Sequence, residues 1–374
     1  MGKQALSGIR VADFSHVVAG PLASHFLALN GAEVIKIEPP HGDPLRNYTL
    51  STAERGMSPA FQGINLGKTS VTLDLKTAEG RAQAESIIAS ADVVVENFRP
   101  GVMARLGLGA DEMRQKYPRL VWCAISGFGQ DGPLADVAAM DQIIQSLSGV
   151  MLLSGMPDDP AQRIGFPLVD TFTGLMAAFA IQTALLQRER GLVEGQMIDV
   201  AMLDSALVMM LSVVNPLLMT GAEPVRTGNR GFSRAPTADT FACADGAITL
   251  GAVEDGHVAR TLAVLGLADL LDDPRFADRA SRARHADAMA DAMAKVLVTR
   301  SAVDWEQAFR RAEVPAARVQ TPAEALAMPH LHQRELFLSV PAPDGGTQRV
   351  LNAGFRFAEG GPGTDRPAPR LGTG

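Results

Sequence analysis

The chain has 374 residues, of which 47% are hydrophobic and 20% charged, a length and an apolar content that predict a large core shared between two domains. Acidic residues (41) outnumber lysines and arginines (34), which gives a formal net charge of -7 and argues against a broad basic surface for nucleic acid. The two cysteines, Cys123 and Cys243, lie far apart, which excludes a disulfide framework and a sulfur-rich metal site.

The sequence carries no feature that predicts export or a membrane span. Its N-terminus lacks both the apolar stretch of a secretory signal and the pattern of a transit sequence. The most apolar run, residues 174–186, is shorter than the roughly 20 residues needed to cross a bilayer and predicts a buried helix. We therefore expect a cytoplasmic protein that acts without membrane contact.

Short β-branched runs alternate with helix-length segments over residues 1–130, which is the order of stacked βαβ units around a buried parallel sheet. A helix is expected over 21–29, where Asn30-Gly31 provides a stop signal. This pattern predicts a doubly wound α/β domain with a Rossmann-like parallel sheet. Its strands are expected over 9–14, 32–38, 70–75, 91–97 and 119–126.

The pattern changes after the predicted sheet. Residues 141–219 are mainly helical, with Met-rich apolar faces expected to pack on the sheet or on a partner subunit. Residues 220–236 are rich in Gly, Arg and Pro, 240–253 suggest a hairpin, and 274–311 suggest charged helices. We predict a large domain over 1–219, a linker and smaller α+β domain over 220–325, and a segment over 326–374 that packs back on the large domain.

Several common enzyme classes lack their signatures. The junction SHVVAGP after the first strand lies where an open α/β sheet binds its ligand. It offers Gly20 followed by Pro21, not the G-x-G-x-x-G of a dinucleotide site. The sequence also contains no P-loop, no HExxH zinc motif and no G-x-S-x-G elbow. These absences argue against a nicotinamide enzyme, a P-loop enzyme, a metalloenzyme and an α/β-hydrolase.

Asp170 follows the apolar stretch FPLV and opens a long helical pattern. One interpretation is a helix cap whose carboxylate accepts backbone N–H bonds, which the composition favours. The other is an oxygen nucleophile, kept ionised by the helix dipole and by the same N–H donors. The two interpretations are compatible.

The sequence contains, in order, GAEVIKIE, NLGKTSVTLDL, VENFRPG, PRLVWCAISGFGQDGP and GFPLVDTFTG. This ordered set resembles the family III CoA-transferases, such as formyl-CoA and carnitine CoA-transferases, which are related to α-methylacyl-CoA racemases. The resemblance implies a Rossmann-like large domain, a smaller domain and a homodimer of two interlocked rings. It also implies coenzyme A as acyl-CoA co-substrate, with no metal and no nicotinamide.

By this resemblance the protein moves coenzyme A from an acyl-CoA donor to a carboxylic acid acceptor, with Asp170 as a nucleophile that forms a covalent aspartyl intermediate. Lys68 and Arg105 would supply cations for the coenzyme phosphates, and Phe98 a surface for adenine. The coenzyme contacts implied by the resemblance are Val18, Ala19, Asn65, Lys68, Asn97, Phe98 and Arg105.

Departures from the family pattern bear on the substrate. Formyl-CoA transferases carry a glutamine where this chain has Val18, and their tetraglycine loop has no equivalent here, which argues against formyl/oxalate exchange. Arg226, Arg230 and Arg234 either fix the second carboxylate of a dicarboxylic acid or form a solvated turn. The identities of the acyl donor and of the acceptor acid stay open.

Two alternative functions remain. A racemase of this superfamily needs a histidine directly before an aspartate, and here the pair is Met140-Asp141. A thioether sulfur cannot accept and return a proton at neutral pH, so transfer is favoured over racemisation. The other alternative is an acyl-CoA-binding protein without catalytic activity.

Overall fold

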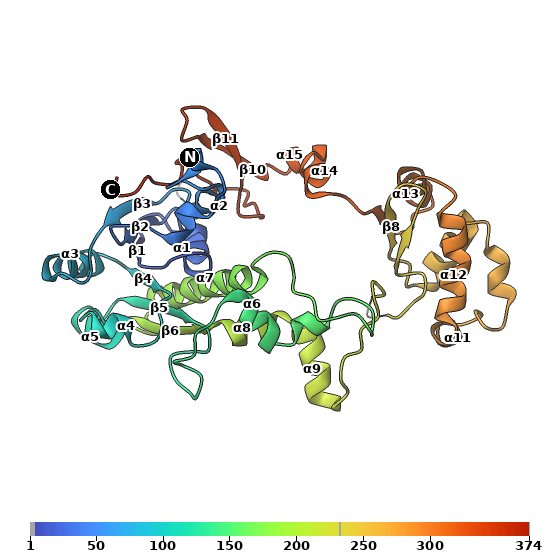
Figure 1. Cartoon of the computed structure of the whole chain (residues 1–374), viewed down its shortest axis with the longest axis horizontal. Helices are drawn as coiled ribbons and strands as arrows, with labels where there is room; N and C mark the ends of the chain where they lie inside the picture. The colour runs from blue at the N-terminus through green and yellow to red at the C-terminus, as the bar shows by residue number, and fades with distance from the viewer. Residues whose placement is uncertain (1–3, 232, 374) are drawn as a thin grey trace. The chain divides into compact units, whose positions relative to one another are not determined.

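The structure, a computed structural model, describes residues 4–231 and 233–373 (Figure 1). The chain forms two compact units. The first contains the residues up to Met151, Arg163–Ala222 and the residues from Pro329 onward, and the second contains Leu152–Gln162 and Glu223–Met328. The domain boundaries expected at 219/220 and 325/326 stay a prediction.

A six-stranded parallel sheet forms the centre of the first unit, in the order β3-β2-β1-β4-β5-β6. The order reverses between β1 and β4, which defines the topological switch point of a doubly wound sheet. The predicted α/β sheet is confirmed. The strands are β1 (Arg10–Asp13), β2 (Glu33–Glu38), β3 (Thr69–Thr72), β4 (Val93–Glu96), β5 (Val121–Ser126) and β6 (Gln196–Ala201).

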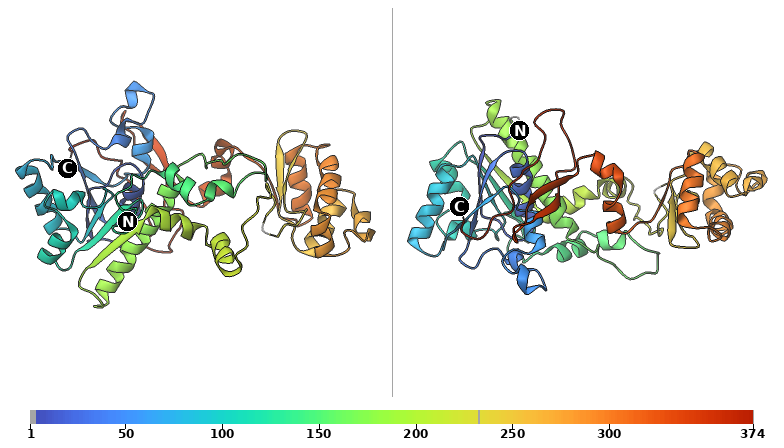
Figure 2. Two further views of the ribbon diagram at one scale, coloured as in Figure 1. Left: turned by 60° about the horizontal axis from the view of Figure 1, so that its bottom comes forward. Right: turned by 90° about the horizontal axis from the view of Figure 1, so that it is seen from above.

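Helices cover both faces of this sheet, and α1 and α7 lie side by side on one of them (Figures 1 and 2). Val93 and Val95 pack with α1 and α7, whereas Val94 packs with α3, α4 and α5. Because alternate side chains enter opposite cores, the strand is apolar throughout. The helices are α1 (Ala19–Leu29), α3 (Ala78–Ala89), α4 (Val102–Arg105), α5 (Ala110–Lys116) and α7 (Leu168–Glu189).

The segment predicted to be mainly helical also contains β6, which the prediction missed. β6 is an edge strand that exposes Asp199, and its short alternating pattern lies between two Met- and Leu-rich helical segments. Gly195 directly precedes the strand, at a position where a Cβ would collide with the backbone oxygens of Pro118 and Leu120. The neighbouring helices are α6 (Asp141–Leu147), α8 (Met202–Met209) and α9 (Leu211–Thr220).

The predicted apolar helix over 174–186 is part of the longer α7. By length and composition, α7 is the one single helix among the described residues that could cross a membrane. In this structure its inner face, which includes Ala177 and Ile181, packs in the core formed with α1 and the sheet. Such packing is typical of the core helix of an α/β domain.

The second unit contains a three-stranded antiparallel sheet in the order β7-β8-β9. The predicted hairpin is confirmed by β7 and β8. Met293, Trp305 and Phe309 pack against this sheet in a separate core. The elements are β7 (Thr240–Ala242), β8 (Ala247–Leu250), β9 (Ala316–Arg318), α10 (Asp255–Val264), α11 (Arg279–Arg284), α12 (Ala286–Leu297), α13 (Ala302–Arg311) and α14 (Pro322–Leu326).

The C-terminal segment belongs to the first unit and is tied to it by hydrogen bonds. Arg46 Nη1 donates to the Pro369 carbonyl (3.1 Å), and the Gly372 N–H donates to Ser70 Oγ (3.1 Å). The remaining elements are α15 (Pro329–Gln333), β10 (Phe337–Pro341), β11 (Thr347–Leu351), α2 (Pro59–Gly63) and 3-10 turns at Pro44–Asn47, Thr52–Glu54, Val150–Leu152 and Ala268–Asp272.

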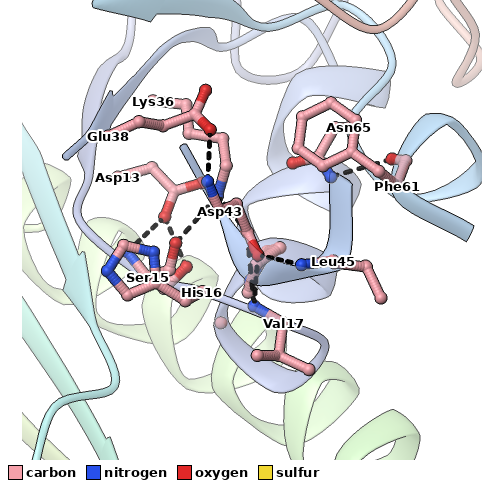
Figure 3. Close-up of polar contacts among 12 residues, drawn as sticks. Asp13, Ser15, His16, Val17, Lys36, Glu38, Asp43, Leu45, Phe61 and Asn65 are labelled. Carbon is pink, nitrogen blue, oxygen red and sulfur yellow. Dashed lines mark hydrogen bonds and ion pairs between the residues drawn. The ribbon is translucent and has the colours of Figure 1, made fainter. Parts of the chain in front are cut away.

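A buried ionic network stands at the carboxyl end of β1 (Figure 3). Asp13 accepts hydrogen bonds from Lys68 Nζ (3.0 Å) and Ser24 Oγ (2.6 Å), and Lys36 pairs with Asp43 at 3.0 Å. Burial alone would raise the pKa of Asp13, but Lys68, Lys36 and the serine hydroxyls lower it to about 2. The network therefore contains full charges that compensate one another inside the protein.

Replacing Lys68 with methionine should destabilise the first unit strongly, because it leaves the Asp13 carboxylate buried without its partner. We expect a loss of about 3–5 kcal/mol, measured as a lower urea midpoint by circular dichroism. Lys116→Met, which removes exposed ion pairs with Glu85 and Glu112, is the matched control and should unfold close to the wild type. Equal losses of stability in the two variants would show that the buried ion pair contributes no more to folding than the exposed ion pairs.

Candidate active site

A cavity of about 830 Å³ lies in the first unit, a volume typical of sites for small molecules. Its walls come from the loops after β1, β4 and β5, represented by Val18, Phe98 and Gly127, and from the start of α7 at Asp170. These loops leave the carboxyl ends of the strands on both sides of the switch point, which is where doubly wound sheets bind their ligands. The fold therefore places the cavity at its expected binding position.

The loop after β1 is held in an unusual conformation. Val17 has a φ of 64°, which a β-branched residue rarely adopts. The Asp43 carboxylate accepts its N–H at 3.2 and 3.3 Å, and the Asn97 side chain bonds both the N–H and the carbonyl of His16 at 2.8 Å (Figure 3 shows Val17, His16 and Asp43). The surrounding polar groups thus fix the shape of the loop before any ligand arrives.

The packing of this loop explains why residue 20 is a glycine. A Cβ at this position would collide with the Ser15 side chain, so glycine allows α1 to start close behind the loop. The junction that lacked a dinucleotide motif therefore uses its one glycine for packing. Val18 and Ala19, which follow the strained residue, line the cavity.

His16 contributes a neutral ring to the cavity wall. Its ring meets that of Phe98 edge-on, with centroids 5.2 Å apart, and its buried Nδ1 has no hydrogen-bond partner within residues 4–231 and 233–373. Burial, and then the charge of Lys36, lowers the pKa of His16 against the opposing effect of Asp43. The imidazole is therefore uncharged at neutral pH.

The start of α7 is capped from outside the helix. The Asp141 carboxylate accepts the backbone N–H groups of Val169 (2.8 Å) and Asp170 (3.1 Å). Gln145 Nε2 donates to the same carboxylate at 2.6 Å. The N-cap is Pro167, whose side chain makes no capping bond, so the prediction that Asp170 caps its own helix is wrong. No hydrogen bond from the described residues engages the Asp170 carboxylate.

This arrangement changes the ionisation of Asp170. Burial, and then the negative charge of Asp141, raises the pKa of Asp170 to about 7. The expectation that N–H donors keep this group fully ionised is wrong, because Asp141 takes those donors. Carboxyl groups with such raised pKa values cluster at functional sites, and here the group faces a cavity.

The structure brings together most of the predicted site residues but not all. Val18, Ala19, Asn97, Phe98 and Asp170 line the cavity.

Asn65, Lys68 and Arg105 do not line this cavity. The Lys68 ammonium is buried and bonded to Asp13, Ser24, Asn65 and the Pro21 carbonyl, so the prediction that it offers phosphate a free cation is wrong. Asn65 is likewise buried and its side-chain amide donates to the Phe61 carbonyl; its contact with the coenzyme stays a prediction. Arg105 is exposed at the end of α4.

Other residues at the site had no role in the sequence analysis. Asp141 was noted there only because Met140 precedes it, and Gln145 and Arg163 were not singled out. Arg99 and Arg163 both line the cavity. The basic turn of the second unit differs, because Arg230 pairs with Asp239 (3.1 Å) and Asp287 (3.0 Å) and is not available as a free cation.

The sequence as a whole matches the profile of CoA-transferase family III over residues 6–374. The succinate–glutarate CoA-transferase of Agrobacterium fabrum is 35% identical, with 99% of this chain and 94% of that protein covered. The acetyl-CoA:oxalate CoA-transferase of Acetobacter aceti is 37% identical, with coverages of 90% and 86%. Rv3272 of Mycobacterium tuberculosis, named a probable fatty acyl-CoA transferase, is 33% identical, with coverages of 94% and 92%.

Solved structures agree with these relatives. A CAIB/BAIF family protein from Brucella suis superposes with a TM-score of 0.89 at 32% identity, over 99% of this chain and 97% of that chain. The crystal structure of Rv3272 has a TM-score of 0.87 at 32% identity, with the same coverages. The fold therefore places this chain in the CAIB/BAIF class of α/β proteins. The chain belongs to CoA-transferase family III and is a CoA-transferase.

The raised pKa of Asp170 can be tested directly. In Asp141→Asn the negative charge next to Asp170 is lost while an amide oxygen remains to accept the two N–H groups. We expect the pKa of Asp170 to fall from about 7 but to stay above its ordinary value, since burial is the larger cause. Carbon-13 NMR of aspartate-labelled protein, assigned with Asp170→Asn, measures this shift.

The exposed Asp111→Asn substitution on α5 is the control and should leave the titration of Asp170 unchanged. A titration curve that is the same in Asp141→Asn and in the wild type would contradict the proposed coupling.

Proposed function

We propose that this family III CoA-transferase moves coenzyme A from an acyl-CoA to a carboxylic acid through a covalent intermediate on Asp170. The single observation that carries this proposal is the state of that carboxylate. It is half-buried in the cavity wall, its pKa is raised, and its helix N–H donors are bonded to Asp141 instead. Its oxygen atoms are therefore left for a substrate.

In the first half of the reaction, an ionised Asp170 oxygen attacks the thioester carbonyl carbon. The carbon–sulfur bond breaks, the thiolate of coenzyme A leaves, and Asp170 becomes part of a mixed anhydride. The thiolate then attacks Cγ of Asp170 and expels the donor acid as a carboxylate. The product on the enzyme is an aspartyl-CoA thioester, and no proton or electron is gained or lost.

The second half repeats these steps in reverse with the acceptor acid. Its carboxylate attacks Cγ of Asp170, expels the thiolate and forms a second anhydride. The thiolate attacks the acyl carbon of the acceptor and releases the Asp170 carboxylate. The net result is one new thioester and one free donor acid.

Particular residues support this chemistry. Leu22, Ile64, Phe166 and Met202 give the cavity an apolar lining, which limits the access of water to an anhydride that water would hydrolyse. Val18, Ala19, Asn97 and Phe98 are the proposed coenzyme contacts on the opposite loops. Arg99, directly after Phe98, takes the cationic role that Lys68 cannot fill.

The arrangement favours transfer over racemisation. Met140 lines the cavity and is 63% exposed, at the position where a racemase carries its histidine. A thioether has no basic atom to remove an α-proton. A homodimer of interlocked rings, a coenzyme contact at Arg105 and a cytoplasmic location stay predictions that follow from the sequence.

The nucleophile assignment predicts that Asp170→Asn abolishes transfer, because an amide oxygen does not form the anhydride. We expect turnover to fall by about 10⁴-fold or more, with new thioesters measured by mass spectrometry. Binding of coenzyme A, measured by calorimetry, should stay near the wild-type value, since the other contacts remain. Asp111→Asn serves as control for purification and folding. Sustained turnover in Asp170→Asn would disprove the assignment.

A further inference from the structure

Two arginines of the cavity wall have no polar partner within residues 4–231 and 233–373. Arg99 and Arg163 both line the cavity and are exposed, and among the described residues neither guanidinium makes a hydrogen bond or an ion pair. The other charged lining groups are the carboxylates of Asp141 and Asp170. An anionic substrate that approaches Asp170 therefore meets two carboxyl groups, and a guanidinium nearby can offset their repulsion.

Arg163 lies in the same chain segment as Asp170, and α6 holds the backbone of that segment. Gln145 Oε1 accepts the N–H of Ile164 at 2.9 Å, one residue after Arg163, while Asp141 holds the other end of the segment at Asp170. The hydrogen bond between Gln145 and Asp141 joins these two anchors. Gln145 is fully buried, so α6 holds the backbone of this segment at Ile164 and again at Asp170.

The positions of the two arginines suggest that they bind different parts of the substrates. Arg99 follows Phe98 and Asn97, on the side of the cavity where the coenzyme contacts are proposed. Arg163 instead lies on the segment that ends in the nucleophile, which is the segment an incoming acid must meet.

A guanidinium binds a carboxylate through two parallel hydrogen bonds. The reacting carboxylate of the acid must stay free to attack Cγ of Asp170, because pairing with an arginine would reduce its nucleophilicity. We propose that Arg163 binds the second, non-reacting carboxylate of a short dicarboxylic acid. The substrates of this enzyme are then dicarboxylic acids and their monothioesters. This inference rests on the proposed function of Asp170, and it replaces the role considered for Arg226, Arg230 and Arg234.

The test compares acids of equal length that differ in one carboxylate: succinate with butyrate, and glutarate with valerate. The wild type, Arg163→Gln and Arg163→Lys are assayed with the best acyl-CoA donor held at saturation. We expect Arg163→Gln to raise KM for the two dicarboxylates about 10- to 100-fold and to leave KM for butyrate and valerate unchanged. Arg163→Lys, which keeps the charge, should recover part of the loss. Binding of free coenzyme A should be unchanged in both variants.

The matched control is Arg190→Gln, at the opposite end of α7, which should behave as the wild type. The inference is overturned if the wild type uses no dicarboxylate, if Arg163→Gln leaves KM for dicarboxylates unchanged, or if it weakens all acids and coenzyme A alike. These results are separable from failure of the nucleophile assignment. Selective loss of dicarboxylates in Arg163→Gln, together with turnover by Asp170→Asn, would refute only the covalent mechanism.

Discussion

The site depends on one interaction: the Asp141 carboxylate accepts the backbone N–H groups of Val169 and Asp170. A helix start needs acceptors for its free N–H groups, and an aspartate in the first turn is a natural supplier. If Asp170 filled this need, its oxygens would be hydrogen-bonded and its pKa lowered. Because a residue of α6 fills it, Asp170 keeps its oxygens free while burial and a like charge raise its pKa to about 7. The helix is capped without using the carboxylate that faces the cavity.

The loop after β1, which forms another wall of the cavity, is held in place for a different reason. The strained backbone of Val17 is held by Asp43 and Asn97, and Asp43 is itself paired with Lys36 inside the ionic network. Breaking buried ion pairs is costly because each leaves an uncompensated charge. The network therefore stabilises a loop conformation that its own sequence does not favour, and a preformed loop is suited to binding an extended ligand with little ordering cost.

The sheet could be predicted well from the sequence because strands that are buried on both faces consist of continuous runs of apolar residues. It missed β6, whose edge position gives a short half-polar pattern between helical segments. The site was predicted in part. Asp170 and the loops near Val18 and Phe98 were identified through family motifs. Lys68 was misjudged because a buried, fully bonded lysine and a solvent-facing one look alike in sequence. Gln145 and Arg163 were missed because only the folded chain brings α6 to the start of α7.

The proposed mechanism requires that Asp170 itself becomes covalently modified during transfer. The most direct test is to mix the wild-type enzyme with an acyl-CoA donor in the absence of acceptor acid, quench rapidly with hydroxylamine, and map the modified peptide by mass spectrometry. We expect a hydroxamate on Asp170, because hydroxylamine attacks either the anhydride or the thioester at Cγ. An unmodified Asp170 in an enzyme preparation that transfers coenzyme A normally once acceptor acid is added, or a hydroxamate at another carboxylate, would contradict this mechanism.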